Sequence, residues 1–312
     1  MKTVVVFNMR GGIGKTTIAV TPAESLAYFC GLRVLIIDAD PQRNTSLRLC
    51  ERGVVDECSQ ARTGKNISKY LSDAVIRNEL PNPKGYITEK VGTIHGQGQV
   101  DILMGSLDTI DADRHFAGRL TTHGDRSLFS DLGKAFGNLG RGTHYDVMVV
   151  DSPPALSTLV QGALCVADLL VVPMMAQSTS QLLYGSTEKQ IHRHLKAIGV
   201  SVPETLVVAT MYEASNRAYF DRIREYFGSD LKIRKQKSFL DRELYSPEDG
   251  TTVKEKYGTA APDLKAVGTV VAQRVGLRIS KPTKATRKAK HKEARNVGKR
   301  RGSSSGTVAR AD

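Results

Sequence analysis

The stretch that decides the fold is NMRGGIGKTT, Asn8–Thr17, which follows the apolar run KTVVVF at residues 2–7. Three consecutive valines predict a buried parallel strand, and the glycine-rich residues after them turn the chain into a helix. Glycines let backbone amides approach a ligand closely, and the free amides and positive dipole end of a helix N-terminus attract an anion. The stretch therefore predicts a strand–loop–helix unit that binds phosphate.

The GKT at the end of this stretch indicates a nucleotide phosphate. Lys15 is long enough to reach the β- and γ-phosphates, and the hydroxyl of Thr16 can hold Mg²⁺. The stretch is the second half of a P-loop, because Met9 replaces the first glycine of the usual motif, six residues before the lysine. The alternative is a plain glycine-rich turn with a solvated Lys15, which the flanking strand and helix disfavour.

Composition excludes several classes of protein. The chain has 312 residues, of which 40% are hydrophobic, enough for a core in one or two domains. It has no long apolar run, and its first residues form a strand without a cleavable signal, so we expect a soluble cytoplasmic protein. The four cysteines show no CxxC spacing, which predicts neither a zinc site, a disulfide framework nor an iron–sulfur cluster.

Basic residues are concentrated at the end of the chain. Residues 278–312 contain twelve lysines and arginines against two acidic residues, in a chain whose net charge is +13. This segment has few apolar residues and no aromatic ones, so we expect it to be disordered by itself. The predicted organisation is one folded domain at residues 1–277 and a basic tail at residues 278–312.

Strand and helix signals alternate through the folded part. Buried strands are predicted at residues 33–40, 99–105, 145–151, 167–174 and 205–212. Helices are predicted after the P-loop and at residues 126–139, 182–195 and 216–227. This alternation predicts an α/β fold: a single P-loop NTPase domain with a mostly parallel sheet covered by helices on both faces.

Three carboxylates follow predicted strands. Asp38 and Asp40 end one strand and Asp151 ends another, and in parallel sheets ligands bind at the carboxyl ends of strands, where the P-loop also falls. Mg²⁺ keeps several waters and needs anionic oxygens to orient them, so Asp151 is a candidate for a magnesium site as well as for a helix cap. Of Asp38 and Asp40, one can order the metal shell while the other positions a water for attack on the γ-phosphate.

Three motifs in this order carry a family resemblance. RGGIGKTT, VLIIDADPQRNTS and YDVMVVDSPPAL together resemble the deviant Walker-A ATPases of the ParA/MinD group, and the ParA-type partition ATPases most closely. The likeness covers nearly the whole folded part, including ADLLVVPM, ATMYEAS and SPEDGTTV. It implies an ATPase of slow intrinsic turnover that uses ATP and Mg²⁺, forms a homodimer on ATP, binds DNA non-specifically and is stimulated by a ParB-type partner.

The resemblance also assigns roles to residues. It implies that the nucleotide phosphates are bound by Gly11, Gly12, Ile13, Gly14, Lys15, Thr16 and Thr17. Thr16 and Asp151 would serve Mg²⁺. The catalytic residues would be Arg10, Lys15, Asp38 and Asp40, with Asp40 tied to water activation and Asp38 supporting it.

Arg10 stands where relatives carry their signature lysine, which reaches across the dimer to the phosphates of the partner. A guanidinium binds phosphate through two hydrogen bonds, whereas an ammonium acts as a point charge. We therefore expect Arg10 to act in trans. The alternative is a solvated loop arginine.

Two further residues depart from the family pattern. Pro22 lies inside the helix after the P-loop, where it should remove a backbone hydrogen bond and kink the helix. Arg43 stands where the family motif DPQGN has glycine, and it should add positive charge close to the nucleotide. Both substitutions could alter dimerisation or turnover without removing a catalytic group.

Non-specific DNA is the partner that the charge favours, because lysines and arginines gain affinity for phosphates by releasing counterions. Candidate DNA-binding residues in the tail are Arg287, Lys288, Lys290, Lys292, Lys299, Arg300 and Arg301. The family resemblance adds, by loose similarity of position, Arg193, Arg217, Arg222 and Arg224 in the domain. These residues predict an association with the nucleoid. The P-loop begins within ten residues of the start of the sequence, so we expect no operator-reading domain before it.

Other functions remain open from the sequence. A MinD-like surface-binding ATPase needs an amphipathic C-terminal helix, and the tail has only Ile279, Val297 and Val308 among its charges, which disfavours membrane binding. The remaining alternatives are a ParA-like ATPase that positions a non-DNA cargo, an ATP-dependent ligase or reductase component, and a DNA-coating protein without useful ATPase activity.

Overall fold

The structure is a computed structural model of the chain, and it describes residues 1–59, 64–177, 180–240 and 244–278. The first compact unit comprises Met1–Arg278. The predicted basic tail, with its seven candidate DNA-binding residues, lies outside the described residues. Within the described ranges, no helix is long and apolar enough to cross a membrane.

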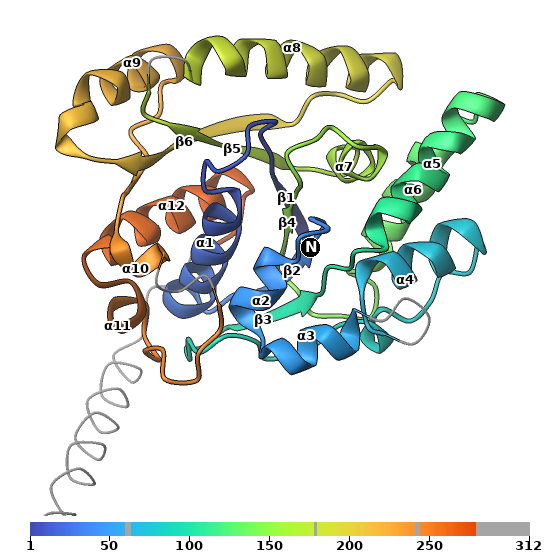
Figure 1. Ribbon diagram of the computed structural model, residues 1–312, viewed down its shortest axis with the longest axis horizontal. Coiled ribbons are helices and arrows are strands. Elements are labelled where there is room, and N and C mark those ends of the chain that lie inside the picture. Colours follow the sequence, from blue (N-terminus) through green and yellow to red (C-terminus); the bar gives the residue numbers. More distant parts are fainter. Residues whose placement is uncertain (60–63, 178–179, 241–243, 279–312) are drawn as a thin grey trace, which may run out of the picture. The chain divides into compact units, whose positions relative to one another are not determined.

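A parallel sheet of seven strands forms the centre of this unit, in the order β3-β2-β4-β1-β5-β6-β7 (Figure 1). The strands are β1 (Lys2–Val6), β2 (Arg33–Asp38), β3 (Gln99–Leu103), β4 (Val147–Asp151), β5 (Leu169–Met175), β6 (Glu204–Tyr212) and β7 (Lys232–Arg234). β1 pairs with β4 on one side and with β5 on the other. The loop after β1 therefore leaves the sheet from its middle, between two neighbouring carboxyl ends.

Helices cover both faces of the sheet. They are α1 (Lys15–Cys30), α2 (Asn44–Leu49), α3 (Arg52–Cys58), α4 (Ile67–Leu71), α5 (Thr109–His123), α6 (Ser127–Asn138), α7 (Thr158–Leu164), α8 (Ser180–Ala197), α9 (Arg217–Phe227), α10 (Lys237–Leu240), α11 (Val253–Tyr257) and α12 (Ala261–Arg274). Alternate residues of β1 face opposite layers: Val5 belongs to one core cluster with residues of α4 to α9, whereas Val4 and Val6 are buried outside that cluster. Figure 1 shows α1 and α12 together on one side of β1 and β4, and α4 to α7 on the other.

The predicted α/β fold is confirmed. The five strands predicted after β1 are present as β2 to β6, and the three later helices are present as α6, α8 and α9. One boundary matters for the site, because β2 ends at Asp38 and does not continue to Asp40. The sequence pattern did not indicate α5, in which only Thr109, Ala112 and Phe116 are buried, so its apolar stripe is narrow.

Pro22 does not interrupt α1, which runs as one helix from Lys15 to Cys30. The hydroxyl of Thr21 donates to the carbonyl of Thr17 at 2.6 Å, one turn before the proline. On α12, a Cβ added to Gly268 would lie 3.3 Å from the Ser25 hydroxyl and 3.5 Å from the Pro22 carbonyl. α12 therefore packs closely against the turn of α1 that begins at the proline.

Candidate nucleotide site

The P-loop has the backbone geometry that its glycines predict. Gly12 and Gly14 have φ angles of +70° and +85°, which favour glycine, and Gly14 is the N-cap residue of α1. The carbonyl of Ile13 accepts a hydrogen bond from the Thr210 hydroxyl at 2.8 Å, so the end of β6 fixes the loop. The loop thus presents the N-terminus of a sixteen-residue helix at the carboxyl edge of the sheet.

Lys15 lies against this loop with only 8% of its surface exposed. Its Nζ donates to the carbonyl of Arg10 at 2.9 Å. Burial lowers the pKa of Lys15, and the negative charges of Asp151 and Asp40 oppose that change. The ammonium group of Lys15 therefore interacts electrostatically with Asp151 and Asp40, two of the three carboxylates named from the sequence.

Asp151 is brought to the P-loop by the pairing of β4 with β1, and it is almost completely buried. Its Oδ2 accepts hydrogen bonds from the Thr16 hydroxyl at 2.9 Å and the Thr45 hydroxyl at 2.7 Å. Its Oδ1 is buried and has no hydrogen-bond partner among the described residues. Burial raises the pKa of Asp151 to about 6, and the hydrogen bonds from Thr45 and Thr16 oppose the rise.

This arrangement fits Mg²⁺. A small cation that keeps part of its water shell is bound by a hydroxyl and by carboxylate oxygens, and the unpartnered Oδ1 beside Thr16 is such an oxygen. Thr45 was missed from the sequence. Its position in the DPQRNTS motif, one residue into α2, is the only signal that could have suggested it.

Asp38 and Asp40 have different surroundings. Asp38 is fully buried, and its Oδ2 accepts from both the backbone N–H of Ser46 at 2.8 Å and its hydroxyl at 2.6 Å. Burial, followed by the charge of Asp151, raises the pKa of Asp38 to about 7. Asp38 thus fastens the start of α2 to the sheet.

Asp40 follows the end of β2 and is 8% exposed. Its Oδ1 accepts from the backbone N–H of Gln42 at 2.9 Å. Its charge acts on both Lys15 and Asp151, which places it beside the phosphate-binding loop. Because the strand has ended, the two-residue spacing does not give Asp38 and Asp40 equivalent positions.

The side chains of Arg10 and Arg43 bond to residues outside the P-loop. The Nη2 of Arg10 donates to Gln177 Oε1 at 3.3 Å, and its backbone N–H donates to Asn8 Oδ1 at 3.1 Å. Arg43 has a φ of +60°, which explains why glycine suits this position. Its Nη1 donates to Ser59 Oγ at 2.9 Å and lies 3.6 Å from Asp56, so its charge is directed toward α3.

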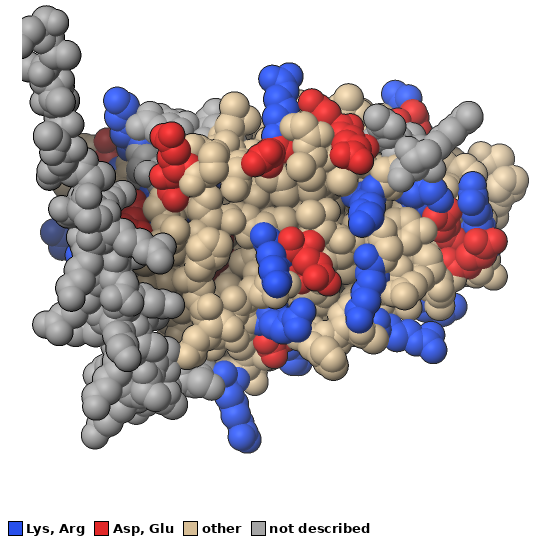
Figure 2. Space-filling model, turned by 90° about the horizontal axis from the view of Figure 1, so that it is seen from below, with Lys and Arg blue, Asp and Glu red and all other residues tan. Residues whose placement is uncertain are grey.

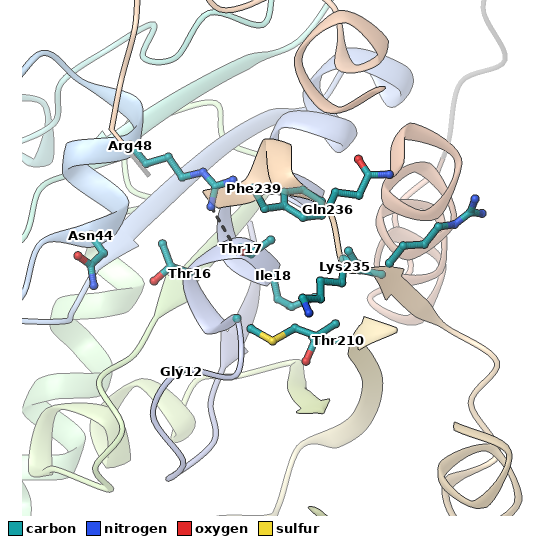
Figure 3. Close-up of a pocket in the computed structure, with 14 residues that line it drawn as sticks. Gly12, Thr16, Thr17, Ile18, Asn44, Arg48, Thr210, Lys235, Gln236 and Phe239 are labelled. Atoms are coloured by element: carbon teal, nitrogen blue, oxygen red, sulfur yellow. Dashed lines mark hydrogen bonds between the residues drawn. The ribbon is translucent and has the colours of Figure 1, made fainter. Parts of the chain in front are cut away.

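A cavity of about 360 Å³ opens beside the P-loop (Figure 3). Ligand pockets in proteins have volumes of about 300–1,000 Å³. The side nearest the loop is polar, and the far side includes the apolar Ile233 and Phe239, so one end suits phosphates and the other a flat base. The cavity is lined by Gly12, Gly14, Thr16, Thr17, Ile18, Asn44, Arg48, Thr210, Met211, Ile233, Arg234, Lys235, Gln236 and Phe239.

Most residues of the far wall of the cavity were not predicted from the sequence. Thr210 and Met211 lie within the quoted ATMYEAS motif, which was the one available signal. Residues 233–239 come from β7 and α10, whose sequence has no nucleotide-binding pattern. Arg48 of α2 was also not predicted, and Figure 3 shows its guanidinium directed toward Thr17.

Comparisons with known proteins agree with this geometry. The family model described as "AAA domain" matches residues 1–198. The chain is 29% identical to the chromosome partitioning protein ParA of Caulobacter vibrioides over 247 residues, which cover 74% of this chain and 78% of the relative. The chain belongs to the ParA-type partition ATPase family.

Solved structures of other proteins show the same fold. The ATP complex of a Cyanothece McdA variant superposes with a TM-score of 0.64 at 20% identity, covering 89% of this chain and 97% of that one. Cobyrinic acid a,c-diamide synthase from Mycobacterium smegmatis, solved with ADP and magnesium, gives a TM-score of 0.61 at 17% identity over 89% of this chain and 97% of that one. The fold alone therefore does not separate partition proteins from a metabolic enzyme, and the separation comes from the sequence relatives.

Proposed function

We propose that this protein is an ATP-switched partition ATPase, which binds MgATP at the P-loop, dimerises, binds DNA non-specifically and releases it after hydrolysis. The observation that carries the proposal is the Thr16–Asp151–Thr45 arrangement, in which one carboxylate oxygen is held by two hydroxyls and the other has no partner among the described residues. Such an oxygen at a P-loop fits the magnesium shell of a nucleotide triphosphate.

The same residues divide the work of hydrolysis. Lys15 and the loop amides bind and orient the phosphates, and Thr16 and Asp151 would hold the metal. Bound Mg²⁺ would neutralise charge on the phosphate oxygens. Asp40, after the end of β2, accepts a proton from or orients the attacking water, while Asp38 keeps α2 and Thr45 in place through Ser46. Intrinsic turnover is slow, as is usual for switch NTPases that wait for a partner.

Arg10 acts on the partner subunit in this proposal. Its guanidinium is directed to Gln177 and is absent from the lining of the cavity of its own chain, while its carbonyl receives Lys15. A side chain at the rim of the loop can reach the γ-phosphate bound to a second copy. ATP then favours the dimer because only the dimer makes this contact, and hydrolysis removes it.

DNA binding is assigned to exposed arginines and to the tail. Arg217, Arg222 and Arg224 of α9 are exposed, although Arg217 and Arg224 lie 3.6 and 3.5 Å from Asp221. On the face shown in Figure 2, basic and acidic side chains alternate among the described residues. Surface pairs of this kind are weak, so DNA phosphates can compete for these arginines. We infer a nucleoid-associated protein that a ParB-type partner stimulates.

The test is the turnover of MgATP by the full-length protein, alone and with non-specific duplex DNA. We expect a low intrinsic rate, on the order of 0.01 per second or less, that rises when DNA and the partner are added. Lys15→Ala serves as the control for contaminating ATPases. A turnover rate that does not change with DNA but depends on a small acidic metabolite would contradict the proposal and favour an ATP-dependent ligase.

A further inference from the structure

Arg48 is a buried arginine at the nucleotide cavity to which no role has been given above. It lies on α2, is 4% exposed and lines the cavity together with Thr16 and Thr17. Its Nη1 donates to the hydroxyl of Thr17 at 3.2 Å, as the dashed line in Figure 3 shows. Arg48 therefore brings a full positive charge to the cavity wall beside Thr17, the third residue of α1.

The rest of this guanidinium is not hydrogen-bonded. Nε and Nη2 of Arg48 are buried and have no hydrogen-bond partner in the part of the chain that the structure describes. A buried charged donor without an acceptor is costly, and such groups in native proteins are usually matched by a ligand, a water or an ion. The planar guanidinium with two donors on one side matches the oxygens of a phosphate.

Glu24, a buried carboxylate of α1, is bonded to other residues. Glu24 of α1 accepts from Lys256 Nζ at 2.9 Å and from the hydroxyl of Tyr257, and Asp249 lies 4.0 Å from Lys256. Arg48 is in electrostatic range of this cluster, because its charge opposes the rise in the pKa of Tyr257 that burial and Glu24 cause. The cluster compensates part of the charge of Arg48 without bonding to Nε or Nη2.

The position of Thr17 indicates which phosphate would be bound. In a P-loop the backbone amides surround the α- and β-phosphates, and the lysine reaches the β- and γ-phosphates. Lys15 Nζ lies at the Arg10 end of the loop, whereas Arg48 lies at Thr17, next to the wall of the cavity that leads to Phe239. Arg48 is thus on the side of the first phosphate and away from the γ-phosphate.

We propose that Arg48 is a phosphate-binding residue in cis, which contacts the α-phosphate of a bound nucleoside di- or triphosphate through its guanidinium group. This inference rests on the proposed nucleotide function. It makes the α2 segment, and not only the P-loop, a determinant of nucleotide affinity. Since ADP and ATP share the α-phosphate, Arg48 would retain nucleotide after hydrolysis and would not discriminate between the two.

The experiment is a calorimetric titration of the full-length protein with ADP and with ADP that carries sulfur on its α-phosphate. The variants are Arg48→Gln and Arg48→Lys, and Arg234→Gln is the matched control. Arg234 lines the same cavity, but its Nε and Nη2 already bond to Asp263 at 2.8 and 3.0 Å. Lys15→Ala is the reference for loss of the whole site.

We expect Arg48→Gln to weaken ADP binding by about 10-fold or more, which is the effect of one lost charge-assisted hydrogen bond, with Arg48→Lys between it and wild type. Arg234→Gln should change the affinity by less than about threefold, as expected for an exposed ion pair. The sulfur substitution should weaken wild type more than Arg48→Gln, because only wild type contacts that phosphate. Without nucleotide, Arg48→Gln should melt no lower than wild type, since it removes a buried charge with two unpaired donors.

Three results would overturn the proposal. The first is an ADP affinity of Arg48→Gln equal to that of wild type. The second is a sulfur substitution that weakens binding to wild type and to Arg48→Gln by the same factor. The third is a melting temperature of Arg48→Gln, without nucleotide, well below that of wild type. The last would make Arg48 a structural residue. If wild type binds neither ADP nor ATP, the proposed function itself is wrong. If wild type binds nucleotide and Lys15→Ala does not, the nucleotide site stands, and any of the three results above overturns only the role of Arg48.

Discussion

The hydroxyl of Thr16 lies 2.9 Å from Oδ2 of Asp151, although the two residues are 135 positions apart in the sequence. The pairing of β1 with β4 aligns Val6 with Asp151, which brings the P-loop and the carboxylate to the same edge. In this buried position Asp151 has a pKa of about 6. A change in the charge of Asp151 should therefore affect both the candidate metal site and the free energy of unfolding.

Asp151→Asn should change the dependence of stability on pH. An unfolded aspartate titrates near a pKa of about 3.9, so folded wild type holds the proton more tightly than the unfolded chain between about pH 4 and pH 6. Relative to Asp151→Asn, wild type should lose on the order of 2–3 kcal/mol of unfolding free energy as the pH rises through this window. Denaturant unfolding at several pH values without nucleotide measures the difference, and a difference that does not change with pH would disprove it.

Asp40→Ala should separate hydrolysis from binding. The variant keeps Lys15, Thr16 and Asp151, so it should bind MgATP and dimerise, while turnover should fall by a factor of about 10² to 10⁴, the usual contribution of a general base. Single-turnover hydrolysis and nucleotide titration measure the two properties. Normal turnover in Asp40→Ala would refute the assignment of water activation to this residue.

Asp38→Ala is the matched comparison, because it removes a carboxylate two residues away. It leaves the N–H and hydroxyl of Ser46 without their buried acceptor. We expect a loss of about 1–3 kcal/mol of unfolding free energy, with any effect on turnover following from the displacement of α2. If Asp38→Ala is as stable as wild type, the anchoring role described here is wrong.

Lys15→Ala should abolish nucleotide binding without unfolding the chain. The ammonium is the only formal charge that the P-loop motif directs at the β- and γ-phosphates, so its loss should weaken ATP binding by roughly 100-fold or more. Lys2→Ala is a suitable control, because Lys2 pairs with Asp168 at 2.8 Å. ATP binding by Lys15→Ala at wild-type affinity would exclude this loop as the nucleotide site.

Arg10→Ala should bind ATP and remain a monomer. Arg10→Lys restores the residue type of the family and should recover part of the dimer, since an ammonium makes a less directional phosphate contact than a guanidinium. Gln177→Ala is the control, because it removes the contact of Arg10 within its own chain and leaves the arginine in place. Sedimentation of the variants with ATP measures the fraction of dimer. A stable ATP-bound dimer of Arg10→Ala would rule out action in trans.

The fold could be predicted because its strands are continuous apolar runs that end in turn or acidic residues. Val4 to Val6 and residues 34–38 and 147–151 are buried on both faces, which gives the same apolar pattern each time. Helix α5 buries three residues and strand β7 one, and neither provides enough periodic signal to be recognised. Pro22 lies inside α1, which is one helix from Lys15 to Cys30, and Gly268 of α12 packs against the turn that begins at the proline.

The site could be predicted only where it is local in the sequence. Lys15, Thr16 and Asp151 belong to motifs whose spacing is fixed by one loop or one strand end. Thr45, Arg48 and the wall from Ile233 to Phe239 reach the cavity through tertiary packing, and no spacing rule links them to the P-loop. The partner of Arg43 could not be predicted for a related reason, because its acceptor Ser59 is the residue that follows the last turn of α3.

The most direct test of the ATP-switched partition ATPase is its binding to non-specific DNA at fixed, near-physiological salt with ATP, ADP and no nucleotide. The full-length protein is compared with a chain that ends at Leu277. The account predicts that ATP alone raises the affinity in both proteins, because the switch lies in the dimer surface. Binding that ignores the nucleotide and disappears with the tail would contradict it, and the ATPase would then serve another cargo or reaction.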